Sequence, residues 1–183
     1  MAIIGIDYSM SCPAIAIHSG DEWGFNNCKF YFLTSVKKHT VSTDNIHATF
    51  YKKDWLSNEE RFDYISSWAI NIIESVSSPK LYVEDYAYSA KGVVFHIGEC
   101  MGILKHKVWS TCPHNLLNPI SPSTIKKFAT GKGNANKLLM YESFIQDTQF
   151  DISATIHCTQ GESPMSDIID AYYIAKYGFF LGK

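Results

Sequence analysis

Four carboxylates stand where a metal-dependent hydrolase could use them. Asp7 and Glu84 each end a short apolar run rich in β-branched residues, a pattern typical of a buried strand. A carboxylate at the end of such a strand is expected at the rim of a sheet. Asp167 and Asp170 are three residues apart at the predicted start of the last helix, so they share one helix face. Together these acids predict a cluster of oxygen ligands.

Such a cluster has a definite chemistry. Four carboxylates brought together repel one another, and some of their pKa values rise unless cations lie between them. Two Mg²⁺ ions about 4 Å apart, for which Mn²⁺ can substitute, would relieve this repulsion, activate a water and stabilise the leaving oxygen of a phosphodiester. Each acid also has a purely structural interpretation. Asp7 is a common turn residue, and one acid of the pair Asp167 and Asp170 is explained by helix capping.

The basic residues are distributed unevenly. The net charge is -2, yet the window 105–137 contains six lysines and no acid, so it carries +6 and the rest of the chain carries -8. This asymmetry indicates a basic surface set against an acidic site, as in a protein that binds a polyanion. A solvated basic face is the alternative interpretation. The lysines that we predict to contact DNA are Lys105, Lys107, Lys126, Lys127, Lys132 and Lys137.

The first half of the chain predicts the strands that position Asp7 and Glu84. Residues 3–17 form an antiparallel hairpin, and 29–34 a third strand. Residues 35–57 mix Lys, His, Thr and Asn without clear periodicity, which leaves either a mobile excursion or an irregular edge strand. An amphipathic helix over 58–76 then precedes the strand that carries Glu84, and strand, helix and strand make a parallel crossover.

The second half predicts helices. A long helix covers 93–109, and its Gly98 and Gly102 are spaced for close packing against another element. Ser121 and Asn134 are expected to begin the next two helices. The remaining segments are a short apolar run at 116–120, a polar loop at 147–164 and a last helix at 166–180. The fold class is therefore α/β, with a mixed central sheet of an antiparallel hairpin and parallel strands, flanked by helices.

Length and composition bound the class of protein. At 183 residues, with 46% hydrophobic residues, we expect one domain spanning 1–183. No stretch approaches the roughly 20 apolar residues of a membrane span, and no signal peptide is visible at the N-terminus. The five cysteines are scattered without a Cys-x-x-Cys pair, which excludes the usual structural zinc spacings and favours reduced thiols. We therefore expect a cytoplasmic location.

Taken in order, these motifs resemble those of RuvC-type Holliday junction resolvases, within the ribonuclease H-like superfamily. Ile4-Gly5-Ile6-Asp7 resembles the first catalytic strand of that family, and Tyr82-Val83-Glu84 the second. Residues 97–102 resemble its glycine-spaced helix, and 125–137 align without a gap to its lysine-glycine segment. Asp167-Ile168-Ile169-Asp170-Ala171 matches the closing Asp-x-x-Asp-Ala helix, so the resemblance runs nearly end to end.

The resemblance implies a ribonuclease H-like fold and a function. The four acids would hold two Mg²⁺ per active site, and Lys137, together with Lys126, would hold the scissile phosphate. The substrate would be branched DNA, above all a four-way junction cut by paired symmetric nicks. The two-fold symmetry of that junction suits a homodimer formed through helix 93–109. The apolar face of this helix is equally explained by packing on the domain's own sheet.

The sequence also departs from the cellular members of the family. After Glu84, where the family uses an aromatic residue to open base pairs, Ala87 lies between Tyr86 and Tyr88, and either tyrosine could stack on an unpaired base. This and the atypical segment 35–57 resemble viral members, which implies a bacterial or a phage-infected host cell. Two alternatives remain open: a ribonuclease H-like nuclease acting on RNA–DNA hybrid, and a non-catalytic module that binds junctions by shape.

Overall fold

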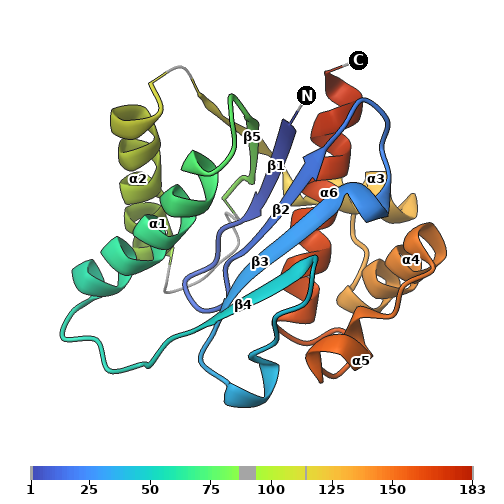
Figure 1. Ribbon diagram of the computed structural model, residues 1–183, viewed down its shortest axis with the longest axis horizontal. Helices are drawn as coiled ribbons and strands as arrows, with labels where there is room; N and C mark the ends of the chain where they lie inside the picture. Colours follow the sequence, from blue (N-terminus) through green and yellow to red (C-terminus); the bar gives the residue numbers. More distant parts are fainter. Residues whose placement is uncertain (1, 87–93, 114, 183) are drawn as a thin grey trace.

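A six-stranded mixed sheet forms the centre of the molecule, with strand order β4-β3-β2-β1-β5-β6 (Figure 1). The structure is a computed structural model, and it describes residues 2–86, 94–113 and 115–182. The strands are β1 (Ala2–Asp7), β2 (Ala14–Ser19), β3 (Cys28–Thr34), β4 (Ile46–Phe50), β5 (Lys80–Glu84) and β6 (Leu117–Ile120).

All strands except β2 run in the same direction. β1 pairs with β5 in parallel, β5 with β6 in parallel and β3 with β4 in parallel, whereas β2 is antiparallel to both β1 and β3. The C-terminal ends of β1, β3, β4, β5 and β6 therefore share one edge of the sheet. Asp7 and Glu84 are the last residues of β1 and β5, so both acids lie at this edge.

Helices cover the two faces of the sheet (Figure 1). One face packs against α1 (Asn58–Glu74) and α2 (Val94–Thr111). The other packs against α3 (Pro122–Thr130), α4 (Lys137–Thr148), α5 (Ile152–Ile156) and α6 (Met165–Leu181). Two short 3-10 helices, η1 (Phe25–Asn27) and η2 (Lys37–His39), flank β3. None of the described helices has the length and apolar character needed to cross a bilayer.

Gly5 fixes the distance between the sheet and α6. Side chains of β1 alternate between the two faces, so Ile4 and Ile6 pack toward α1 and α2 while Gly5 and Asp7 share the α6 face. A Cβ atom at Gly5 would lie 2.3 Å from the backbone nitrogen of Ala175. Only glycine permits α6 to approach this closely, and that approach brings the start of α6 to the end of β1.

The sequence predictions for the fold are largely confirmed, with two corrections. For residues 35–57 the edge-strand alternative holds, because β4 lies at the edge of the sheet and pairs in parallel with β3. The predicted polar loop at 147–164 contains α5, which Asp151 caps by accepting a hydrogen bond from Ser153 N (2.9 Å) and which buries Ile152 and Ile156. The cap of α4 is Asn136 rather than Asn134, with its Oδ1 accepting from Leu139 N (2.9 Å).

Candidate active site

The two strand-end acids point toward α6. In β5, Leu81 and Val83 pack on the α1 and α2 face, whereas Tyr82 packs on the α6 face, as Glu84 does two residues later. Gly178 makes room for the Tyr82 ring, because a Cβ there would lie 2.3 Å from Tyr82 Cδ2. β5 and β1 are therefore held against the same helix by the same device. Their terminal carboxylates face its first turns.

The acids of α6 complete the group. Asp167 is in the first turn of α6 and Asp170 follows one turn later. Asp7 and Asp167 are 7% and 9% exposed, and Oδ2 of Asp167 is buried without a hydrogen-bond partner. Because burying an unpaired carboxylate oxygen costs free energy, this atom indicates a function rather than a contribution to folding.

The pKa values of the acids record how close they are. Burial, and then the carboxylates of Asp167, Glu84 and Asp170, raise the pKa of Asp7 well above its ordinary range. Burial raises the pKa of Asp170 to about 7, and Glu84 and Asp167 add to this rise. Burial also raises the pKa values of Glu84 and Asp167. The structure therefore brings all four predicted acids into one electrostatic group.

Lys126 and Lys137 lie beside these acids. A pocket of about 240 Å³ is lined by Glu84, Asp170, both lysines and Ser166, together with apolar residues. Burial raises the pKa of Glu84, and Lys126 lowers it. Burial likewise raises the pKa of Asp167, and Lys137 lowers it. Lys137 Nζ donates a hydrogen bond to Ser166 Oγ (3.1 Å), which fixes its position next to α6. The pocket therefore combines acids and lysines.

The donor set fits a hard divalent cation. All four ligand candidates offer carboxylate oxygens, which Mg²⁺ and Mn²⁺ prefer, and Asp167 Oδ2 has no competing partner. As placed, no three His, Cys, Asp or Glu side chains among the described residues are close enough to hold one metal ion. Asp7 and Asp167 already share a side-chain hydrogen bond, so a small rearrangement of side chains would bring the acids to ligand spacing.

The other residues predicted to contact DNA lie outside this pocket. Lys105 Nζ lies 3.3 Å from Tyr86 Oη and 4.8 Å from the centre of the Tyr86 ring. Lys107 links α2 to α1 through Asp63, with its Nζ 2.7 Å from Oδ1. Their contact with DNA stays a prediction. Lys127 and Lys132 are exposed on α3 and on the turn after it, and Tyr88 lies outside the described residues.

Helix α2 presents one buried and one open face. The buried face packs into the core between α2 and the sheet through Cys100, Met101, Leu104 and Val108. Packing on the domain's own sheet, rather than dimer formation, therefore explains the apolar residues of this face. The opposite face carries Gly98 and Gly102, and a Cβ at either position would meet nothing within 4 Å. The exposed fractions of Phe95 and Trp109, on the same helix, are 81% and 67%. Any interface formed by α2 must use this open face.

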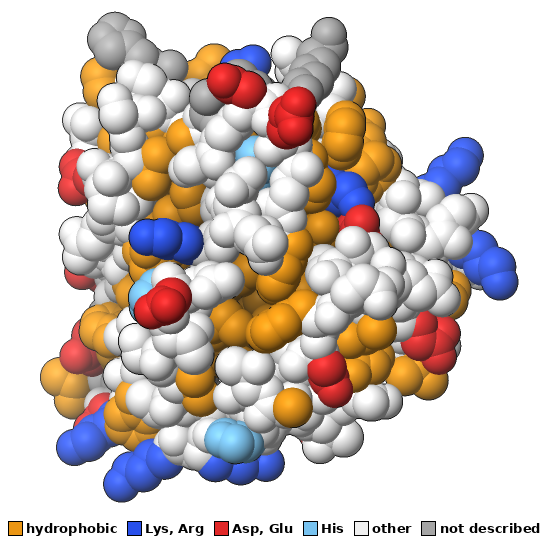
Figure 2. Space-filling view, turned by 45° about the vertical axis from the view of Figure 1, so that its right-hand side comes forward, with side chains coloured by type: hydrophobic (Ala, Val, Ile, Leu, Met, Phe, Trp, Pro, Cys, Tyr) orange, Lys and Arg blue, Asp and Glu red, His pale blue; other side chains and the backbone are white. Residues whose placement is uncertain are grey.

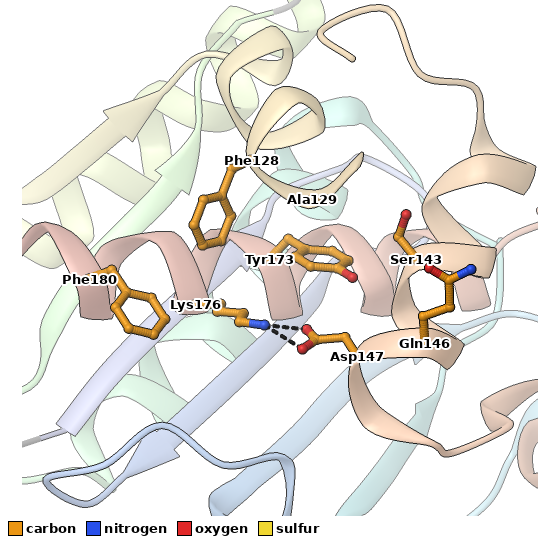
Figure 3. Close-up of a pocket in the computed structure, with 8 residues that line it drawn as sticks. All are labelled: Phe128, Ala129, Ser143, Gln146, Asp147, Tyr173, Lys176 and Phe180. Carbon is orange, nitrogen blue, oxygen red and sulfur yellow. Dashed lines mark hydrogen bonds and ion pairs between the residues drawn. The ribbon is translucent and has the colours of Figure 1, made fainter. Parts of the chain in front are cut away.

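A larger pocket, of about 520 Å³, lies at the other end of α3, α4 and α6 (Figure 3). Phe128, Tyr173 and Phe180 line its apolar side, and an ion pair between Lys176 and Asp147 closes its polar side. None of the four acids lines it. Asp147 also accepts a hydrogen bond from Tyr172 Oη (3.0 Å), so the ion pair has a structural role in joining α4 to α6.

Sequence reasoning missed the serines that support the site. Ser166 holds Lys137, and a hydrogen bond with Ser163 lowers the pKa of Asp167, which burial raises. Both serines closely precede Asp167, and small hydroxyl residues before a helix are a recognised capping signal. Their role toward Lys137 depends on how α4 packs on α6. No local pattern reports that packing.

Comparison with known proteins identifies the fold. The sequence matches no protein-family profile and no curated protein. Among solved structures, Thermus thermophilus RuvC aligns with 100% of this chain and 96% of its own, at 16% identity and a TM-score of 0.62. T. thermophilus RuvC in complex with a Holliday junction substrate aligns with 99% and 94%, at 14% identity and the same TM-score of 0.62. The resemblance inferred from the motifs is thus confirmed as a shared RuvC-like, ribonuclease H-like fold.

Proposed function

We propose that this protein is a divalent-metal-dependent endonuclease that resolves four-way DNA junctions. The observation that carries the proposal is the convergence of four carboxylates from β1, β5 and α6 with Lys126 and Lys137 in one site. The fold shared with T. thermophilus RuvC, which is known in complex with a Holliday junction substrate, supports the choice of substrate. The proposed setting is the cytoplasm of a bacterial or phage-infected cell.

Each acid has a position suited to its part. The pKa of Asp7 responds to all three other carboxylates, so Asp7 would hold metal together with them. Glu84 and Asp170 line the pocket with the two lysines, and Asp7 and Asp167 are buried beside them. When bound, Mg²⁺ would lower the pKa of a water and offset negative charge on the reacting phosphate. The protein's own part is to hold the four carboxyl groups close together at one edge of a rigid sheet, and bound cations would favour their ionised forms.

The two lysines are suited to the phosphate. Lys137 is the first residue of α4, and its hydrogen bond to Ser166 places the ammonium group beside the acids rather than in open solvent. Lys126 approaches the same pocket from α3. An ammonium group held there would attract a phosphate oxygen, and this attraction would become stronger as negative charge develops on the phosphate during cleavage. We therefore assign Lys137 a catalytic role and Lys126 a binding role.

Two active sites are needed for paired nicks, and α2 offers a surface for dimer formation. Gly98 and Gly102 leave backbone uncovered on the open face, and Phe95 and Trp109 supply apolar area on the same helix. A second copy related by a two-fold axis would bury this area and match the symmetry of a four-way junction. We propose the homodimer on these grounds.

A cleavage assay tests the proposal. A labelled four-way junction, the matched linear duplex and an RNA–DNA hybrid are incubated with the protein, with and without Mg²⁺ or Mn²⁺. We expect symmetric nicks in the junction only, and only with metal. Cleavage of the hybrid instead would move the function to the ribonuclease H-like alternative. Tight junction binding without cleavage in either metal would favour the non-catalytic module.

The variant Asp7→Asn separates catalysis from binding. It removes the carboxylate that responds to all the others and leaves Lys126 and Lys137 in place. We expect cleavage to fall by at least about 10³-fold, the scale of losing metal-based charge stabilisation, while junction binding is retained. Asp44→Asn, at an exposed acid, serves as the control. Normal cleavage by Asp7→Asn would contradict the metal-site assignment.

A further inference from the structure

The segments after β3 and β4 reach the same edge of the sheet as the acids. β3 and β4 run parallel to β1, so η2 and the residues that follow Phe50 emerge at the edge where Asp7 lies. In Figure 2, Lys and Arg side chains gather along the lower edge of the molecule, the side on which η2 lies in Figure 1. No sequence motif assigns a role to this region.

Two buried side chains anchor these segments next to the site. Tyr51, 3% exposed, donates a hydrogen bond from its hydroxyl to the carbonyl of Ser11 (2.5 Å), in the turn that follows Asp7. His39, 5% exposed, donates from Nδ1 to the carbonyl of Ile156 (2.9 Å), at the end of α5. The segments are therefore fixed to the turn that follows Asp7 and to the end of α5.

The anchored segments present four lysines to solvent. Lys37 and Lys38 lie in η2 beside His39, and Lys52 and Lys53 directly follow Tyr51; all four are exposed. Within the described part of the chain, none of the four forms an ion pair. Asp54 is the one acid adjacent to them in sequence. Fixing four cations on one edge without acidic partners costs folding free energy through repulsion, which is the signature of a surface for an anionic ligand.

The charges of this surface reach the surroundings of the active site. Burial raises the pKa of Cys12 to about 11, Asp167 adds to the rise, and Lys53 opposes it. Burial also raises the pKa of Cys158, and both Lys38 and Asp167 act on that thiol. Lys53 acts on Cys12, Lys38 acts on Cys158 and Asp167 acts on both thiols, so the lysine surface and the acidic group lie within electrostatic reach of the same part of the molecule.

From this arrangement we propose that Lys37, Lys38, Lys52 and Lys53 form a second DNA-binding surface, which holds the backbone of a duplex arm beside the cleavage site. The inference rests on the proposed function and extends it. β4 lies three strands from β1, and strands are about 4.8 Å apart, so Lys52 and Lys53, which follow β4, lie about 14 Å from Asp7 along the sheet. At about 3.4 Å per base pair, this distance corresponds to about four base pairs. Lys126 and Lys137 line the pocket with Glu84 and Asp170, so DNA would be held both at the cut and beside it.

Charge-removing variants test this surface. Lys52→Gln/Lys53→Gln and Lys37→Gln/Lys38→Gln each remove two charges there, and Lys29→Gln/Lys80→Gln removes two at the opposite edge of the sheet. Junction affinity is measured over a salt series with Mg²⁺ replaced by Ca²⁺ to suppress cleavage. We expect each test pair to weaken binding about tenfold and to lower the slope of log K against log salt by about 2, near one unit for each phosphate that a lysine no longer neutralises. The control pair should leave both unchanged.

A modified substrate places the contact on the DNA. Uncharged methylphosphonate linkages are introduced at about four base pairs from the cut, and in a second junction at the far end of the same arm. The first should weaken binding by wild type but not by Lys52→Gln/Lys53→Gln, and the second should affect neither. Equal affinities of the test and control pairs would overturn the inference while wild-type cleavage still supported the proposed function. A wild type that neither binds nor cuts the junction would overturn the proposed function itself.

Discussion

Asp170 is expected to make the metal-free protein less stable as the pH rises. Burial raises the pKa of this carboxyl from 3.8 to about 7, with Glu84 and Asp167 adding to the shift. The folded protein therefore binds the proton of Asp170 more tightly than the unfolded chain does. The associated stability is fully present below about pH 4 and is lost as the pH rises toward 7.

The size of the effect follows from the shift. At 1.36 kcal/mol per unit, a change from 3.8 to about 7 corresponds to about 4 kcal/mol in full, of which about 2–3 kcal/mol falls between pH 5 and pH 8. Asp170 keeps some contact with solvent, which screens the charge, so we expect about 1–2 kcal/mol in that interval.

Urea unfolding at pH 5 and pH 8 in EDTA measures this loss. Wild type should lose about 1–2 kcal/mol more than Asp170→Asn between the two pH values, because the amide does not ionise. Asp44→Asn, at an exposed acid, should behave as wild type. Adding Mg²⁺ at pH 8 should stabilise wild type and stabilise Asp170→Asn less, since the variant lacks one ligand. Parallel pH profiles for wild type and Asp170→Asn would refute the assignment of Asp170 to a crowded acidic group.

Substitutions at three other residues give sharp expectations. Gly5→Ala should lower the free energy of unfolding by about 1–3 kcal/mol or more, because its Cβ would meet the Ala175 backbone at 2.3 Å, whereas Gly102→Ala should raise it by up to about 1 kcal/mol in the monomer; thermal unfolding compares them. Equal changes in the free energy of unfolding for the two variants would contradict the packing of α6 on β1. In sedimentation experiments, weaker dimer formation by Gly102→Ala would place Gly102 in the dimer interface. Lys137→Ala should lower the single-turnover cleavage rate more than junction affinity. Equal losses would reduce Lys137 to a phosphate anchor.

The predictable part of the site is the part written in local patterns. Asp7 and Glu84 could be found because a buried strand has a recognisable composition and each acid stands at its end. Asp167 and Asp170 could be found because their spacing defines one helix face. The convergence of these elements depends on long-range packing, and here Gly5 is decisive. Glycine is required at position 5 because the backbone of α6 approaches β1 closely, and these two segments are far apart in the chain.

The parts that the sequence did not predict, or left open between two alternatives, lack such periodicity. α5 is a single buried turn of five residues, too short to show a helical repeat. β4 is an edge strand in which only Ile46 is buried, so it shows no alternation of apolar and polar residues. The lysines on either side of it could be counted from the sequence. Their position beside the acids follows from the strand order, in which β3 and β4 lie across β2 from β1.

The charge arrangement poses a problem that the two lysine groups address. DNA must bring a phosphate to a site where four carboxylates repel it, and without metal this repulsion opposes binding. Lysines in the pocket and on the second surface would offset part of this repulsion, and bound metal would offset the rest. In EDTA at pH 8, Asp7→Asn should therefore bind the junction at least as tightly as wild type, since the substitution can only remove negative charge from the acidic group. Saturating Ca²⁺ should reduce this difference or reverse it, because cations then neutralise the wild-type acids. Tighter binding by wild type in EDTA would show that the acids do not face the phosphate.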